Sequence, residues 1–182
     1  LCLTGDHPAL GDHPEAMPVF DLDSVQLLAV ARGLMEGRDM AGNKLEGEPP
    51  SFCLGAVVNP GADPLEPQLM KMAKKIQAGA EFFQTQAIYE PSKFEAFREK
   101  TADMKVPVMA GIVLLKSAGM ARFMNANVAG IHVPDDIIAE MEAAGKEGRV
   151  QRSIEISARL ARQLKEMCQG IHIMALGWEK HV

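Results

Sequence analysis

Polar residues that could do chemistry stand at the ends of short apolar runs along this chain. Asp6 follows the run Leu1 to Leu3 beside a glycine, and Asn59 follows the run Phe52 to Val58. A carboxylate at the end of a buried strand can meet a ligand or tune the charge of a cofactor. Asp6 could equally be a turn or helix-cap residue, since aspartate oxygens accept bonds from nearby backbone N–H groups. Its position alone leaves both interpretations open.

Two glutamines and three lysines also have both a structural and a ligand-binding interpretation. Gln84 and Gln86 alternate along one apolar run, so they point to the same face of a strand. Buried amides need partners, which a ligand or a polar layer inside the protein could supply. Lys71, Lys74 and Lys75 fall in the later turns of a predicted helix, where cations complement the helix dipole. A lysine aimed at a pyrophosphate is the alternative, and composition does not select which one.

The histidines and cysteines are not spaced like a metal site. His7 and His13 lie in two copies of Gly-Asp-His-Pro, and no third ligand follows at the spacing that metal sites use. Cys2, Cys53 and Cys168 are odd in number and far apart, which argues against a zinc motif and a disulfide framework. The sequence therefore predicts no metal and a reducing, cytoplasmic compartment.

Hydrophobic periodicity predicts the elements that must position these residues. The predicted strands are Leu1–Leu3, Phe52–Val58, Phe82–Ile88, Val106–Leu114 and Gly170–Leu176. The predicted helices are Ser24–Met35, Glu66–Ala78, Pro91–Thr101, Ser117–Ala126, Asp135–Ala144 and Arg149–Cys168. The residues with N-cap chemistry are Asp23, Ser117 and Asp135, and those with the chemistry of a helix stop are Gly79 and Gly170. Strands that alternate with helices predict an α/β fold with parallel pairing.

Both an open sheet and a closed barrel match this alternation. No G-x-G-x-x-G or Walker phosphate loop follows a strand, which weakens the nucleotide-binding open sheets. A full (β/α)₈ TIM barrel takes about 250 residues, whereas this chain has 182. We therefore expect an incomplete barrel: residues 1–182 would form the C-terminal portion of a single barrel domain, with about the last five βα units present.

Composition argues against several other classes of protein. The formal net charge is −5, without the clustered Lys and Arg that a nucleic-acid binder needs. The longest apolar runs fall well short of the roughly 20 residues that span a bilayer. We expect no nucleic-acid partner and no membrane span.

Several segments share their order and spacing with one known family. They are Leu3–Pro8, Pro18–Ser24, Val58–Ala62, Lys74–Ala80, Thr85–Gln86, Ala110–Arg122 and Gly170–Trp178. Together they resemble the methylenetetrahydrofolate reductase family. The resemblance implies a (β/α)₈ barrel that holds a flavin, usually FAD, at the C-terminal ends of its strands. Members of the family pass a hydride from NADH or NADPH to the flavin and then to 5,10-methylenetetrahydrofolate, giving 5-methyltetrahydrofolate.

The resemblance also implies roles for individual residues. Asp6 matches an aspartate that lies between flavin and folate and tunes both, so it is the implied catalytic residue. The implied cofactor contacts are Gly5, Asp6, Phe20, Asp21, Asn59, Ala62, Lys71, Lys74 and Lys75, with the lysines near the phosphates. The implied substrate contacts are Asp6, Gln86 and Met120. The general acid of the family, a glutamate on the first barrel strand, would precede Leu1.

The chain departs from the best-studied members at several of these positions. Asn59 replaces a histidine, Gly55 an aromatic residue, Met120 a glutamine and Trp178 an arginine. The departures leave FMN as the alternative to FAD and a redox partner subunit as the alternative to NAD(P)H. A homo-oligomer is the other expected assembly. A pterin-binding methyltransferase barrel without flavin and a non-catalytic scaffold subunit are the alternative functions.

Overall fold

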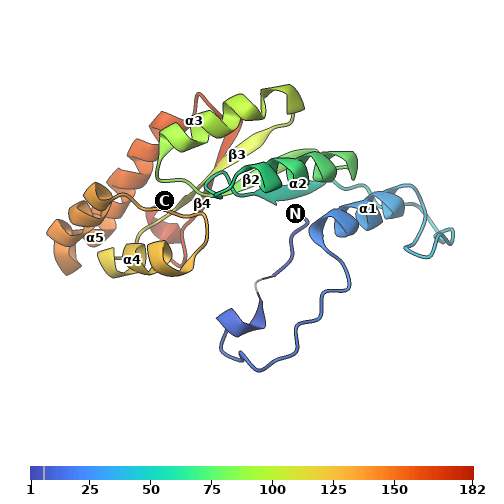
Figure 1. The fold of residues 1–182 in the computed structure, drawn as a ribbon, viewed down its shortest axis with the longest axis horizontal. Coiled ribbons are helices and arrows are strands. Elements are labelled where there is room, and N and C mark those ends of the chain that lie inside the picture. Colours follow the sequence, from blue (N-terminus) through green and yellow to red (C-terminus); the bar gives the residue numbers. More distant parts are fainter. Residues whose placement is uncertain (6) are drawn as a thin grey trace. The chain divides into compact units, whose positions relative to one another are not determined.

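Strands and helices alternate along the chain, so the predicted α/β class is confirmed (Figure 1). The computed structural model describes residues 1–5 and 7–182, and Asp6 lies outside the described residues. Contacts between Cα atoms divide the chain into two compact units: residues 1–57 with 70–82, and residues 58–69 with 83–182. The expectation that residues 1–182 belong to a single barrel domain remains a prediction.

The first unit contains helix α1 (Ser24–Met35), most of strand β1 (Gly55–Val58) and most of helix α2 (Glu66–Gln77). A short 3-10 turn, η1 (Pro8–Leu10), precedes them. α1 begins where predicted because Asp23 and Gln26 form a capping box. The Asp23 carboxylate accepts from the backbone N–H of Gln26 at 2.8 Å, and the Gln26 side chain accepts from the N–H of Asp23 at 2.8 Å.

The predicted strand Leu1–Leu3 is shorter than expected. Only Cys2 is paired: it forms a parallel bridge with Ala56 and donates its N–H to the carbonyl of Gly55 at 2.8 Å. The two residues on either side of Cys2 are exposed, so they gain little from pairing with a second strand. Alternation of apolar residues over three positions is too short a signal to fix a strand.

The second unit is built on parallel strands. β2 (Phe82–Ala87) pairs with β3 (Val108–Val113), β3 pairs with β4 (Gly170–Met174), and the order in the sheet is β1-β2-β3-β4. Each strand is shorter than its predicted apolar run. After β3, Leu114 is 1% exposed and donates its N–H to the carbonyl of Met174 at 3.2 Å, so burial and pairing continue one residue past the strand.

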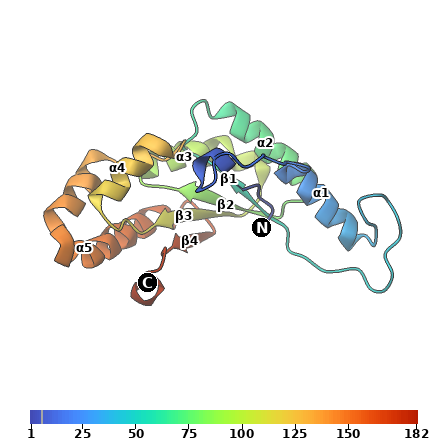
Figure 2. The same cartoon turned by 90° about the horizontal axis from the view of Figure 1, so that it is seen from below.

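Helices cover one face of these strands. They are α3 (Pro91–Lys100), α4 (Ala118–Asn127) and α5 (Asp135–Leu164), with short 3-10 turns at η2 (Ala102–Met104) and η3 (Glu179–His181). α5 packs on β3, and both α3 and α4 pack on α5, as Figure 2 shows. The core between these layers contains Phe83, Phe94, Phe97, Val108, Ile112, Ile156 and Leu164, all at most 1% exposed. Burying one such side chain stabilises the fold by about 1.5–3 kcal/mol.

The opposite face of the strands is less covered. Gln84 pairs in register with Met109, and Met174 with Val113, so these side chains lie on one face of the sheet. Gln84, Met109 and Met174 are half-buried, as is His172. Within the second unit, this face therefore has room for atoms that the helices do not supply.

The long helix α5 contains a break that the sequence predicts. Gly145 has φ 59° and ψ −164°, which is not helical, and it separates the two helices expected at Asp135–Ala144 and Arg149–Cys168. The predicted end was wrong, because α5 ends at Leu164 and Gly170 is the first residue of β4. Pro134 occupies the N-cap position, and Asp135 is the first helical residue, where a carboxylate still complements the helix dipole.

An irregularity in β2 brings its backbone so close to Gly111 of β3 that no side chain fits at this position. The register shifts between Gln84 and Ala87, so that two residues of β2 stand opposite one residue of β3. A Cβ atom on Gly111 would lie 2.5 Å from the carbonyl oxygen of Thr85. A side chain at this position would force the two strands apart.

Gly111→Ala should therefore lower the free energy of unfolding by about 1–3 kcal/mol, because the new methyl group meets backbone that cannot move aside cheaply. Urea unfolding followed by circular dichroism measures the change. Gly148→Ala is the matched control, since its added Cβ meets only Ala144 at 3.6 Å inside α5. That control should be neutral or stabilising, and an equal loss in both variants would contradict the steric explanation.

Candidate functional site

Parallel pairing brings the polar loops of the second unit to one edge of the sheet. The loops that follow β2, β3 and β4 begin at Ile88, Leu114 and Ala175. Because parallel strands end on the same side, all three loops lie at the carboxyl edge, where α/β proteins bind their ligands. This edge is the candidate functional site of the second unit.

Gln86 lies within the irregular stretch of β2. The hydroxyl of Thr85 donates to the carbonyl of Gln86 at 2.8 Å and accepts from the N–H of Gly111 at 2.9 Å. The hydroxyl thus replaces a ladder bond that the irregularity removes. Bulges of this kind re-aim side chains and are frequent beside active sites. Gln86 and Gln84 are both half-buried, and the side chain of Gln86 accepts from the N–H of Ala87 at 3.3 Å.

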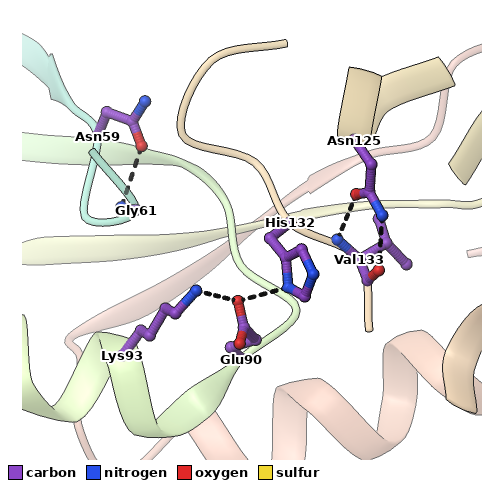
Figure 3. Close-up of polar contacts among 7 residues, drawn as sticks. All are labelled: Asn59, Gly61, Glu90, Lys93, Asn125, His132 and Val133. Carbon is purple, nitrogen blue, oxygen red and sulfur yellow. Dashed lines mark hydrogen bonds and ion pairs between the residues drawn. The ribbon is translucent and has the colours of Figure 1, made fainter. Parts of the chain in front are cut away.

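Asn59 joins two loops of the second unit. Its side-chain oxygen accepts from the N–H of Gly61 at 3.1 Å, and its side-chain nitrogen donates to the carbonyl of Ala129 at 3.0 Å (Figure 3). A Cβ atom on Gly130 would collide with this amide. The amide therefore holds the loop after β1 against the connection between α4 and α5. One N–H and one lone pair of the amide remain for a further partner.

The same connection carries a histidine beside a glutamate. His132 Nδ1 lies 2.9 Å from Glu90 Oε2, and Lys93 Nζ lies 2.6 Å from the same oxygen (Figure 3). Asn125 secures the neighbouring Val133, whose N–H and carbonyl both bond to its amide at 2.7 and 2.9 Å. Glu90, Lys93 and His132 are among the residues that line a small pocket at this end of β2.

After β3 and β4, a lysine lies over a tryptophan. Lys116 Nζ is 5.9 Å from the centre of the Trp178 ring, within the range of a cation–π contact. The N–H of Lys116 also contacts the sulfur of Met120 at 3.4 Å, and Ser117 caps α4 through the N–H of Met120 at 3.1 Å. Met120, a predicted substrate contact, is half-buried in this group.

In the first unit, the three predicted lysines differ from one another. Lys75 is 5% exposed and its ammonium donates to the carbonyl of Val57 at 2.6 Å, whereas Lys71 and Lys74 are exposed. Burial, together with the positive charge of Lys71, lowers the pKa of Lys75 to about 8, and Asp23 opposes the shift. Lys71 Nζ lies 3.9 Å from the Asp23 carboxylate. The structure thus groups Lys71 and Lys75 beside one acid.

The remaining predicted residues of the first unit are open to solvent. Phe20 is 56% exposed and its ring centre lies 6.2 Å from that of His7. Asp21 is exposed, and no heavy atom lies within 4 Å of a Cβ built on Gly5. The predicted catalytic residue Asp6 lies outside the described residues.

Gly55 has a structural explanation for its lack of a side chain. The ring of Phe82 fills the space in which a Cβ atom of residue 55 would lie. An aromatic side chain at position 55 is therefore incompatible with this packing.

Some site residues were missed from the sequence. Glu90 and His132 are 42 residues apart, and neither stands in a recognisable motif. Thr85 could have been noticed, because a threonine between two half-buried glutamines is the residue whose hydroxyl can replace a lost ladder bond. Of the predicted residues, Met120 is grouped with Lys116 in the second unit, and Lys71 with Lys75 in the first. Ala62 is half-buried and donates its N–H to the carbonyl of Asn59 at 3.4 Å.

Other kinds of site were sought in the part of the chain that the structure describes. Residues 1–5 and 7–182 contain no group of three or more His, Cys, Asp or Glu side chains placed to hold a metal ion. Over the same residues, no helix has the length and apolar character needed to cross a membrane. Cys2, Cys53 and Cys168 are free thiols.

A parallel α/β fold with polar side chains gathered at the carboxyl ends of its strands defines a ligand-binding α/β protein. Comparison with known families identifies the family within this class. The methylenetetrahydrofolate reductase family model matches residues 1–182, and the chain belongs to that family.

Individual relatives are distant. The chain is 25% identical over 204 aligned residues to methylenetetrahydrofolate reductase 2 of Schizosaccharomyces pombe, a match that covers 100% of this chain and 30% of that protein. The chain thus spans about 30% of the length of this curated relative. A solved structure of an uncharacterized protein from Clostridium thermocellum that binds two copies of 5-methyl-5,6,7,8-tetrahydrofolic acid is 20% identical. That match has a TM-score of 0.49 and covers 73% of this chain and 50% of the other.

Asn59→Ala should destabilise the second unit by about 1–2 kcal/mol, because the carbonyl of Ala129 and the N–H of Gly61 lose their partner. Hydrogen exchange of the Ile131 and Val133 amides should speed up in the variant. Asn127→Ala is the matched control: its amide only bonds the carbonyl of Phe123 on an exposed helix face. Unchanged exchange in Asn59→Ala would contradict the bridging role.

Lys75 predicts a dependence of stability on pH. Its pKa of about 8 in the folded protein lies below the ordinary value of 10.5, so the unfolded chain binds more protons between these values. The contribution of Lys75 to the free energy of unfolding therefore rises as the pH increases from 8 to 10.5, and the full cost of burying the charge is present below pH 8.

Urea unfolding of the protein and of Lys75→Met at pH 7.5 and pH 10 measures this effect. Lys75→Met should have the larger free energy of unfolding at pH 7.5, because it removes the buried charge, and this difference from the unmodified protein should shrink at pH 10. The exposed neighbour gives the control, because Lys74→Met removes the same charge without relieving burial. Parallel pH curves for the protein and Lys75→Met would show that the amine is not held in an unfavourable environment.

Proposed function

We propose that this chain is part of a flavin-dependent reductase that converts 5,10-methylenetetrahydrofolate to 5-methyltetrahydrofolate. The observation that carries the proposal is the family match, which runs through residues 1–182. The site supports it, because the polar side chains of the second unit gather at the edge where the strands end. The chain matches only 30% of the length of its curated relative, so the activity of the whole protein is part of the proposal.

A (β/α)₈ barrel is the architecture that we propose for the complete protein. Helices lie on one face of β2–β4, while the other face is half-buried and carries polar as well as apolar side chains. In a closed barrel, the helix-free face points into the interior and is filled by side chains from the other strands. The half-buried state of Gln84 and Met109 fits that arrangement.

The lysines of the first unit fit an anionic cofactor. Lys71 and Lys75 lie close enough for the charge of Lys71 to lower the pKa of Lys75, and one carboxylate, Asp23, stands beside them. A phosphate group would relieve this excess of positive charge. We therefore propose that Lys71, Lys74 and Lys75 hold the phosphates of FAD, with FMN as the alternative. The exposed ring of Phe20, with Asp21 next to it in the chain, would contact the adenosine part of FAD.

A flavin bound there would supply the hydride chemistry, accepting a hydride from NADH or NADPH and delivering it to the methylene carbon of the folate. The residues of this chain would bind and orient the reactants. Gly5, Asn59 and Ala62 would line the flavin, and Gln86 and Met120 would contact the folate. Asp6 would act through its negative charge on the reacting groups.

The proposed protein is cytoplasmic. It works either as a homo-oligomer that uses NAD(P)H or in a complex with a redox partner subunit. The intact protein, purified from its source, tests the proposal directly. It should be yellow, release FAD or FMN on denaturation, and reduce 5,10-methylenetetrahydrofolate. A colourless protein that binds folate but cannot be reconstituted with either flavin would favour a methyltransferase. A protein that binds neither would favour a scaffold.

Asp6→Asn should lower kcat for folate reduction by about 100-fold while flavin still binds, because a lost charge acts on the reacting groups more than on docking. The chain offers a matched control in the second copy of Gly-Asp-His-Pro, where Asp12→Asn makes the same change outside the proposed site. Stopped-flow absorbance of the flavin separates its reduction by NAD(P)H from its reoxidation by folate. Equal turnover for Asp6→Asn and the unmodified protein would rule the role out.

A further inference from the structure

The loop that follows β4 holds an unusual backbone conformation. Leu176 and Gly177 both have positive φ, 51° and 89°, and Leu176 is a residue that rarely adopts it. Its side chain is 48% exposed, so burial does not compensate for the cost. Two bonds hold the turn: Trp178 donates its N–H to the carbonyl of Ala175 at 3.1 Å, and Gly177 donates to the Glu179 carboxylate at 2.9 Å. Outliers of this kind cluster at functional sites.

This turn places Trp178 next to the loop that follows β3. The β3–β4 ladder ends with Val113 opposite Met174, and Leu114 adds one more bond to the carbonyl of Met174 at 3.2 Å. Beyond that point, Lys116 extends over the Trp178 ring at 5.9 Å. The His181 ring also meets Trp178, edge-on, with the ring centres 6.3 Å apart. The tryptophan ring thus lies beside the ammonium group at the carboxyl edge.

The charge of Lys116 is not neutralised by a close acid. Among residues 1–5 and 7–182, no carboxylate oxygen lies within 4.0 Å of its ammonium. The nearby Glu179 is held by its own turn: bonds from its own N–H and from Gly177 lower the pKa of its carboxyl group, and Lys116 contributes less. One oxygen of the Glu179 carboxylate thus accepts from the N–H of Gly177, and it forms no ion pair with Lys116 within 4.0 Å.

The helix that follows Lys116 adds to the positive potential. α4 begins at Ala118, and its N-terminal N–H groups point out of the helix toward the carboxyl edge. Ser117 caps only the N–H of Met120. Gly119 is exposed, and beyond its chain neighbours and its own helix backbone a Cβ atom there would meet the Ser117 hydroxyl at 3.6 Å, so the first turn of the helix is open to an approaching group.

We infer that Lys116, positioned by Trp178, binds a carboxylate of the glutamyl tail of the folate substrate. The inference rests on the proposed function, because a folate joins flat rings to a tail whose carboxylates are ionised at neutral pH. An ammonium group beside an aromatic ring suits this ligand. The Lys116 ammonium would pair with a tail carboxylate, and the Trp178 ring would pack against the aminobenzoyl ring of the folate. A phosphate of the nicotinamide donor has the same charge, so the experiment must distinguish the two.

Lys116→Gln in the intact protein should raise KM for methylenetetrahydrofolate roughly tenfold, because one charge-assisted hydrogen bond is lost. kcat and KM for the nicotinamide donor should stay unchanged. Lys116→Arg should restore KM, since it keeps both the charge and the contact with the ring. Trp178→Ala should raise KM about threefold by freeing the lysine. Lys165→Gln, at the opposite edge of β4, is the matched control and should have no effect.

Competition with p-aminobenzoylglutamate and with its uncharged diamide isolates the carboxylate. Lys116→Gln should weaken inhibition by the acid about tenfold and leave inhibition by the diamide unchanged. Equal weakening of both inhibitors, or a change only in KM for the donor, would overturn the inference. If the unmodified protein binds flavin and reduces folate but Lys116→Gln behaves like it, the inference fails while the proposed function stands. If the unmodified protein neither binds flavin nor reduces folate, the proposed function fails, and the inference that rests on it fails with it.

Discussion

Parallel pairing of β3 with the strands on either side is the constraint on which the second unit depends. It sends three loops to the same edge, and it forces each connection to cross back over one face as a helix. The helices bury Phe83, Phe94 and Phe97 against that face, so the core and the site are consequences of one pairing. A strand reversed in direction would place its loop at the other edge, away from the polar residues.

Side chains that form hydrogen bonds with backbone groups far away in the sequence then fix the loops at this carboxyl edge. Thr85 replaces a missing ladder bond, Asn59 joins two loops, and Tyr89 donates its buried hydroxyl to the carbonyl of Val113 at 2.8 Å. Burial raises the pKa of Tyr89, which keeps its hydroxyl a donor. Each of these bonds stabilises the fold by only about 1 kcal/mol. Their main effect is positional, because they fix loops that regular structure does not reach.

Local signals in the sequence were sufficient for most elements. Asp23, predicted as an N-cap, places the start of α1 to the residue, and the two helices predicted on either side of Gly145 match the break in α5. Both features depend on neighbours within a few positions. The contact between Glu90 and His132 could not be predicted, because it joins residues 42 positions apart with α3, β3 and α4 between them. The end of α5 was placed too late for a similar reason: apolar periodicity continues past Leu164 although the chain must turn into β4.

The positions at which this chain departs from its family also have local structural explanations. The Phe82 ring occupies the space of a side chain at Gly55, and Lys116 contacts both Met120 and Trp178. The Met120 sulfur contacts the backbone N–H of Lys116 at 3.4 Å, and the Trp178 ring centre lies 5.9 Å from its ammonium nitrogen. The loops after β3 and β4 therefore place a lysine ammonium beside an indole ring at the carboxyl edge. On the inference drawn above, Lys116 would supply at this edge the positive charge that the family resemblance implies for an arginine at position 178.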